Sequence, residues 1–185
     1  MKKTLLALPL GLAFAMAGQS AFANTGTITF TGRIDAGTCP ITIVDPITGP
    51  SSAILVGYPN VADFPSSGSE SVGREFQLKI KPGAGCPTAT TSATVTFSAA
   101  NGGAGAGGLL YGLKTLPGAA TGIAVAIKDN LGALVNNGVA SKSYPVSGTS
   151  DSTLSFRALY KSYEPQAALT AGPAEADVNF TVTII

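Results

Sequence analysis

The stretch Ile28-Thr-Phe-Thr-Gly-Arg-Ile34 alternates apolar and polar side chains, and Val178-Asn-Phe-Thr-Val-Thr-Ile184 repeats this alternation at the other end of the chain. A period of two residues is typical of a β-strand with one buried face and one solvated face. The first stretch runs into Asp35-Ala-Gly-Thr38, a turn-type sequence that ties it weakly to the rest of the chain. A strand at a free end can pair with another molecule, so we predict a detachable N-terminal arm over residues 24–35.

Residues 1–23 have the features of a secretory signal peptide. Lys2 and Lys3 supply the positive start, residues 5–17 supply the apolar stretch, and Ala21-Phe-Ala23 forms a small-x-small cleavage site. The apolar stretch is interrupted by Pro9 and is shorter than the roughly 20 residues of a membrane span. We therefore predict an exported protein that begins at Asn24.

The remaining chain suits one domain, which we place at residues 36–185. Without Lys2 and Lys3, nine basic residues face ten acidic ones, and no basic stripe or basic helix is present. Nucleic acid and anionic membranes are thus not predicted as partners. Charged residues make up 11% of the chain, a low fraction that weakly favours a surface largely used in protein contacts.

Short strands and turns account for almost the whole domain. No stretch longer than ten residues shows a capped 3.6-residue repeat, so helix content should be minor. The pattern predicts an all-β, antiparallel sandwich of immunoglobulin type, and the absence of Trp separates it from the antibody kind. We expect a loop over the glycine run 101–108, a connection over 165–173, and strands over residues 40–44, 53–56, 72–80, 93–97, 122–127, 133–135, 153–160 and 178–184.

Cys39 and Cys86 are the two cysteines of the chain. Export to an oxidising compartment predicts that they form one disulfide. A metal site or redox pair is disfavoured because the sequence has no His and no Cys-x-x-Cys spacing.

The sequence offers little catalytic chemistry. Without His there is no Ser-His-Asp arrangement, and no two carboxylates stand out as an acid and base pair. The glycine run lacks the Lys-Ser/Thr of a phosphate loop, and Asn179 begins a glycosylation sequon to which we give no weight. We predict neither an enzyme nor a cofactor.

Several motifs together resemble one family. Gly26-Thr-Ile-Thr-Phe-Thr-Gly-Arg-Ile34 precedes Cys39, Arg74-Glu-Phe-Gln-Leu-Lys-Ile80 precedes Cys86, and later come Ser155-Phe-Arg-Ala-Leu-Tyr160 and Gly172-Pro-Ala-Glu-Ala-Asp177. In this order they resemble subunits of chaperone-usher fimbriae, the type 1 pilin group, over the whole exported chain. The family usually carries an aromatic residue next to last, where this chain has Ile184.

The resemblance implies an immunoglobulin-like domain that lacks its seventh strand and accepts one from another molecule. The three large apolar side chains of the arm would offer roughly 5–9 kcal/mol of gross burial. A glycine would let the incoming backbone lie close to the groove floor. The resemblance assigns the donor strand to Gly26, Ile28, Phe30, Gly32 and Ile34. It assigns the acceptor groove and chaperone contact to Val178, Phe180, Val182, Ile184 and Ile185. From alternation alone, these last residues would be assigned to the core of a complete sandwich, and only the family pattern reverses that order.

The implied partners are neighbouring subunits in a homopolymer or mixed fibre, a periplasmic chaperone and an outer-membrane usher, with the product displayed on the cell surface. Contact with a host receptor would be indirect. One alternative is a minor tip subunit or adhesin of the same fimbria, although a receptor-binding domain normally precedes the pilin domain in such proteins. Another is an exported enzyme or inhibitor built on a complete sandwich.

Overall fold

The strongly alternating segments form the longest strands. A computed structural model describes residues 39–83, 86, 88–89 and 91–185, all within the compact unit Asp35–Ile185. In β10 (Ser152–Ser162) every even-numbered side chain is buried, and in β11 (Val178–Ile184) the even-numbered side chains are half-buried while their neighbours are exposed. The period-two patterns therefore give the predicted half-buried strands.

The remaining strands are mostly short, and the described helices are three-residue 3-10 turns. No helix in the described part of the chain has the length and apolar character needed to cross a membrane. The strands are β1 (Ile41–Asp45), β2 (Gly49–Pro50), β3 (Arg74–Ile80), β4 (Thr91–Ala99), β5 (Gly103–Ala104), β6 (Leu110–Tyr111), β7 (Ile123–Asp129), β8 (Leu134–Val135) and β9 (Tyr144–Val146). The 3-10 turns are η1 (Val61–Asp63), η2 (Ala106–Gly108) and η3 (Gln166–Ala168).

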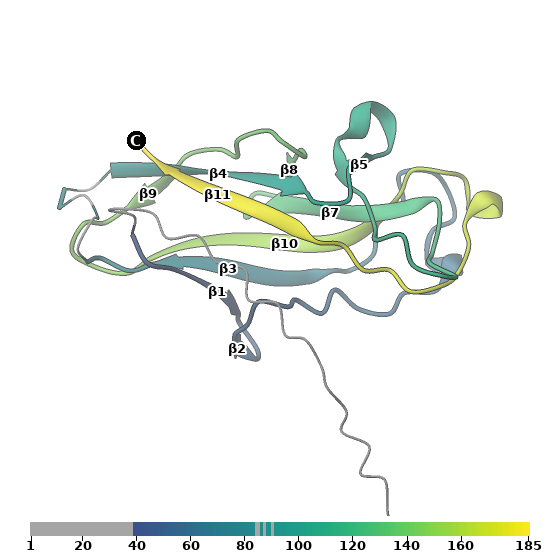
Figure 1. Cartoon of the computed structure of the whole chain (residues 1–185), viewed down its shortest axis with the longest axis horizontal. Helices are drawn as coiled ribbons and strands as arrows, with labels where there is room; N and C mark the ends of the chain where they lie inside the picture. The colour runs from purple at the N-terminus through teal and green to yellow at the C-terminus, as the bar shows by residue number, and fades with distance from the viewer. Residues whose placement is uncertain (1–38, 84–85, 87, 90) are drawn as a thin grey trace, which may run out of the picture. The chain divides into compact units, whose positions relative to one another are not determined.

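The strands form two antiparallel sheets. The larger has the order β2-β1-β3-β10-β7-β6-β5, with β8 also paired to β7, and the smaller has the order β11-β4-β9. In Figure 1, β11 and β4 lie over β10 and β3 as the second layer. Among the described residues, β11 lies at the end of the smaller sheet, so the all-β sandwich has an open edge there.

An aromatic cluster fills the space between the sheets. Phe156 stacks on Phe76 at 5.6 Å between ring centroids and meets the edge of Phe97 at 5.0 Å. Tyr144 packs on the same ring at 5.4 Å. Burial raises the pKa of Tyr144 to about 12, so its hydroxyl stays protonated at neutral pH.

The disulfide predicted from the two cysteines is present. Cys39 and Cys86 lie 4.8 Å apart between Cα atoms. Cys39 lies just before β1 and Cys86 lies beyond the end of β3, and Ile41 of β1 pairs with Ile80 of β3. The bond therefore joins two neighbouring strands of the larger sheet at their shared end.

The glycine run differs from the predicted plain loop. Gly103–Ala104 pair with Tyr111 and Leu110, and η2 lies between the two strands. Gly105, Gly107 and Gly108 have φ near +70°, a conformation that glycine adopts readily. Residues 103–111 thus form a glycine flap. In it, Leu110 packs against Ala124, Ala126 and Leu159 in an apolar cluster on the outer face of the larger sheet.

The strand predicted over residues 53–56 is absent. After Ser51 donates its amide hydrogen to Ile43 O (3.1 Å), no backbone hydrogen bond joins residues 54–59 to either sheet within the described chain. The apolar residues of this stretch face a groove beside β11 instead of a neighbouring strand. The continuous apolar run Ala53-Ile-Leu-Val56 was a misleading signal here, because apolar composition reports burial and not pairing.

The turn after β1 is held by a buried carboxylate. Asp45 is 3% exposed, and its side chain accepts hydrogen bonds from the Ile47 and Thr48 amides at 2.8 and 3.3 Å. Arg74 of β3 donates two more, from Nε at 2.9 Å and from Nη2 at 3.0 Å. The Arg74 guanidinium, followed by these amides, holds the pKa of Asp45 below its ordinary value of 3.8.

We expect Asp45→Asn to lower stability at neutral pH and to remove part of the acid sensitivity. A carboxyl with a lowered folded-state pKa stabilises the fold above its unfolded-state value, and this contribution is lost as pH falls below 3.8 through the folded-state value. Denaturant midpoints of wild type and variant, compared in the same assembly state, should differ at pH 7 and converge towards pH 3. An equal difference at both pH values would contradict this account.

Candidate functional site: an open strand edge and its groove

The outer edge of β11 presents unpaired backbone groups. Ile185 and Ser92 exchange both of their backbone hydrogen bonds, at 2.7 and 3.2 Å, and Ala100 N donates to Asp177 O at 2.9 Å. In the observed register, the backbone N–H and C=O groups of the odd-numbered β11 residues thus point toward β4. The N–H and C=O groups of Val178, Phe180, Val182 and Ile184 therefore point the other way. Within the described residues, no strand pairs with them.

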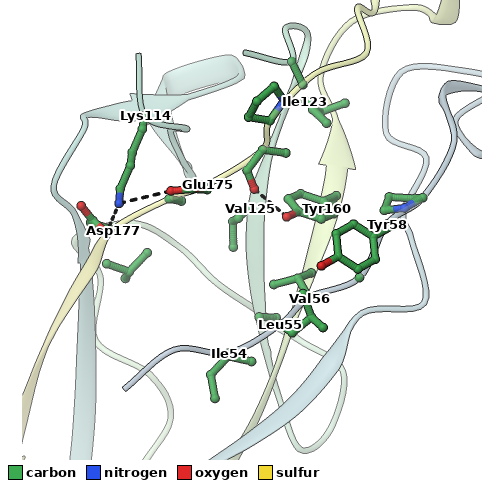
Figure 2. A pocket seen from close by; sticks show the side chains of 18 of the residues that line it. Ile54, Leu55, Val56, Tyr58, Lys114, Ile123, Val125, Tyr160, Glu175 and Asp177 are labelled. Atoms are coloured by element: carbon green, nitrogen blue, oxygen red, sulfur yellow. Dashed lines mark hydrogen bonds and ion pairs between the residues drawn. The ribbon is translucent and has the colours of Figure 1, made fainter. Parts of the chain in front are cut away.

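An apolar groove of about 720 Å³ runs beside this edge. Its floor includes the buried side chains of Phe64, Phe76, Leu78 and Phe97. Figure 2 shows Ile54 and Val56 on one side, and Lys114, Glu175 and Asp177 on the opposite side. The groove thus lies between residues 54–59 and the approach to β11, and the half-buried side chains of Ile54, Val56, Val178 and Phe180 line it.

The predicted acceptor residues divide into two groups. Val178 and Phe180 line the groove. Val182 and Ile184 pack against the aromatic core from the same face of β11 but lie beyond the groove lining. Ile185 is 70% exposed and extends the ladder with Ser92 through its backbone.

The predicted donor positions Gly26, Ile28, Phe30, Gly32 and Ile34 lie outside the described residues, as do the signal segment 1–23 and the arm 24–35. The structure therefore describes only the residues of the predicted acceptor side. The role of the donor positions stays a prediction.

The motif Gly172-Pro-Ala-Glu-Ala-Asp177 lines the end of the groove that lies next to the start of β11, and hydrogen bonds fix its backbone. Its carbonyls accept hydrogen bonds one after another: Pro173 O from the Ala120 amide at 2.9 Å, Ala174 O from Tyr160 Oη at 2.6 Å, and Glu175 O from the Lys114 amide at 2.7 Å. Burial raises the pKa of Tyr160, which keeps this phenol a donor. We call residues 172–177 the backbone clamp, because these hydrogen bonds fix the position of the chain just before β11 begins.

Gly172 fits this clamp because it has no side chain. A Cβ built there would collide with the backbone carbonyl of Gly118 and the backbone of Ala119 and Ala120. We expect Gly172→Ala to destabilise the protein by about 1–3 kcal/mol, since rigid backbone must move. The neighbouring substitution Ala171→Gly, measured in the same denaturant titration, is the control for backbone flexibility. Unchanged stability of the Gly172 variant would mean that the close approach is unimportant.

Charge collects at the same end of the groove. Lys114 Nζ lies 3.0 Å from Asp177 Oδ1 and 3.6 Å from Glu175 Oε2. The Asp177 carboxylate raises the pKa of Lys114. One ammonium serves two carboxylates that are each more than 60% exposed, so a negative charge remains uncompensated.

Sequence reasoning missed part of this site. It assigned residues 53–56 to a strand and gave no role to Lys114 or Phe64. Lys114 follows the glycine flap and its position depends on how that flap folds, which no local pattern encodes. The hydrophobic residues Ile54, Leu55 and Val56 were a usable signal, because an apolar run without a pairing partner must be covered by something else.

Fold and site together define a class: an antiparallel immunoglobulin-like sandwich with an open strand edge at β11 and an apolar groove beside it. The fimbrial protein family matches residues 28–184. The chain belongs to this family, and it is a structural subunit of fimbriae, which are carried on the cell surface.

Known proteins agree with this assignment. A type-1 fimbrial protein subunit of Serratia marcescens is 31% identical, with 98% of each chain covered. Long polar fimbria protein A of Salmonella typhimurium is 29% identical, covering 98% of this chain and 97% of the relative. A chain of a chaperone-usher pilus structure shares the fold, with a TM-score of 0.57, 17% identity and coverage of 97% and 99%. The predicted fold class and the resemblance to the type 1 group are confirmed.

Proposed function

We propose that this chain polymerises by strand exchange: the arm, residues 24–35, of one subunit fills the edge groove of the next. The observation that carries the proposal is the coincidence of unpaired backbone groups on β11 with an open apolar groove over the aromatic core. Unpaired edge groups and half-exposed apolar side chains both cost free energy, and one added strand removes both costs.

The arm has the composition this role needs. Its even-numbered residues include Ile28, Phe30 and Ile34, and its odd-numbered residues are four Thr, Arg33 and Asp35. The odd-numbered residues of β11 are similarly Asn179, Thr181 and Thr183, all on the outer face. An arm laid beside β11 would thus continue both the apolar inner face and the polar outer face of the small sheet.

The proposal extends to the path of export. Residues 1–23 act as a signal peptide, a periplasmic chaperone covers the groove before assembly, and an outer-membrane usher receives the chaperoned subunit. These steps are supported by membership of the fimbrial family and by the hazard of an uncovered edge. The role is structural and not catalytic, which is the role the family is known for.

One rearranged chain tests the proposal. A copy of residues 24–34 is appended after Ile185 through a flexible linker, and the original arm is deleted. We expect a stable monomer that neither donates nor requires a strand, visible as one monomeric species by light scattering. The control appends the same segment with Phe30→Asp. If both chains behave alike, or if the first still polymerises, the proposal fails.

A further inference from the structure

We propose that Asn101 is a site of spontaneous covalent modification, at which the side-chain amide is hydrolysed to aspartate or isoaspartate. The chain has two Asn-Gly pairs, Asn101-Gly102 and Asn137-Gly138. The fold protects the second pair and leaves the first one open to reaction. The reaction does not depend on strand exchange.

The chemistry needs only the chain and water. The backbone N of the residue after Asn attacks the side-chain Cγ, and the new C–N bond closes a succinimide ring. The Cγ–Nδ2 bond breaks, and ammonia leaves with the proton of the attacking amide. Water then opens the ring at either carbonyl, which gives aspartate or isoaspartate without any transfer of electrons to another molecule. A following glycine favours ring closure, because it has no side chain to obstruct the approach of its N atom.

Three hydrogen bonds hold the Asn137-Gly138 pair. Asn137 Oδ1 accepts from the Ala99 amide at 2.8 Å, and Asn137 Nδ2 donates to Gly108 O at 3.1 Å. The Gly138 amide, whose N atom would attack, donates to Phe97 O at 2.8 Å. The Asn137 side chain is also half-buried. These hydrogen bonds must open before the ring can close, so we expect Asn137 to react slowly in the folded protein.

Asn101 lacks this protection. It lies in the turn after β4, it is exposed, and its side chain makes no hydrogen bond with the part of the chain that the structure describes. Gly102 is exposed as well, and a Cβ built on it would meet no atom within 4 Å. The Asn101 side chain can therefore turn toward the following amide without first breaking a contact.

The two products differ in their effect on the chain. Gly102 O accepts from the Gly112 amide at 2.9 Å, and this hydrogen bond ties the end of β4 to the chain beyond the glycine flap. A Cβ built on Gly112 would lie 2.6 Å from Gly102 O and 3.2 Å from Asn101 O, so the two segments are in close contact. Isoaspartate brings the side-chain methylene into the backbone before Gly102 and thus displaces the Gly102 carbonyl. Aspartate adds only a negative charge.

Peptide mapping by mass spectrometry tests the assignment. Purified fibres of the wild-type protein are incubated at mildly alkaline pH, and the modified fraction at both asparagines is followed with time. Labelling with an isoaspartyl methyltransferase identifies isoaspartate. We expect Asn101 to react at least about tenfold faster than Asn137, because three hydrogen bonds must open at Asn137. In the denatured protein, the two sites should react at similar rates.

Equal rates at the two sites in the fibres, or an Asn101 that stays intact, would overturn the assignment. A difference that persists in the denatured protein would also overturn it, because the neighbouring sequence and not the contacts of Asn137 would then be the cause. Asn101→Gln is the matched variant, since glutamine would have to close a larger ring. We expect this variant to lose the modification at position 101 and to leave the rate at Asn137 unchanged.

Amide hydrogen exchange at Gly112 tests the consequence for the chain. In molecules that carry isoaspartate at position 101, the Gly112 amide should exchange at least about tenfold faster than in unmodified molecules, because its acceptor is displaced. Asn101→Asp carries the charge without the longer backbone and should exchange at the unmodified rate. Unchanged exchange in the isoaspartate molecules would show that the modification leaves this contact intact and would overturn the predicted consequence.

Discussion

Phe30→Asp should abolish fibre formation while leaving the subunit folded on its chaperone. The substitution removes about 1.5–3 kcal/mol of apolar burial and places a carboxylate against the Phe64, Phe76 and Phe97 floor of the groove. The floor is apolar and Lys114 at the side of the groove is already paired with Glu175 and Asp177, so an unpaired charge on the floor costs several kcal/mol more. Electron microscopy of cells expressing the variant should show no fibres.

Thr29→Asp is the matched control for this experiment. The same carboxylate is introduced one residue away, on the face of the arm that the alternation predicts to point to solvent. We expect this variant to assemble. Normal fibres from Phe30→Asp, or equal loss from both variants, would contradict the assignment of the inward face.

Cys39→Ser should lower the free energy of unfolding by about 4 kcal/mol, since it opens a loop whose ends are 47 residues apart in sequence. A small domain has a net stability of roughly 5–15 kcal/mol, so much of the folded population should be lost. The periplasmic yield of folded subunit and its denaturant midpoint measure the effect.

The double variant Cys39→Ser with Cys86→Ser controls for the thiol left behind by the single substitution. Both variants should lose a similar amount, because the crosslink and not either side chain is the source of stability. If yield and midpoint are unchanged in both, the disulfide between the ends of β1 and β3 has no stabilising role.

Local alternation in the sequence was sufficient to locate the major strands. β3, β4, β10 and β11 each appear within a few residues of their predicted bounds, because a half-buried strand must alternate. The strand predicted from the continuous apolar run 53–56 was wrong, because these side chains face an open groove and no strand pairs with them among the described residues. Burial pattern and strand pairing are separate properties, and sequence alternation reports the first.

The site was harder to predict than the strands. The even-numbered positions of β11 could be named as a face, yet only the pairing of Ile185 with Ser92 shows which backbone groups are free. The contact of Lys114 with Asp177 and Glu175 joins residues about 60 positions apart and depends on the clamp around Gly172. Such long-range contacts have no local signature.

Amide hydrogen exchange on the appended-arm monomer tests the central claim most directly. The claim predicts slow exchange at Val178, Phe180, Val182 and Ile184, comparable to the β4-facing amides of Asn179, Thr181 and Thr183. The same chain with Phe30→Asp in the copied arm should lose protection at the even-numbered positions first. Fast exchange at those four amides in the unmodified copy, with the odd-numbered amides protected, would show that the arm does not complete the sheet.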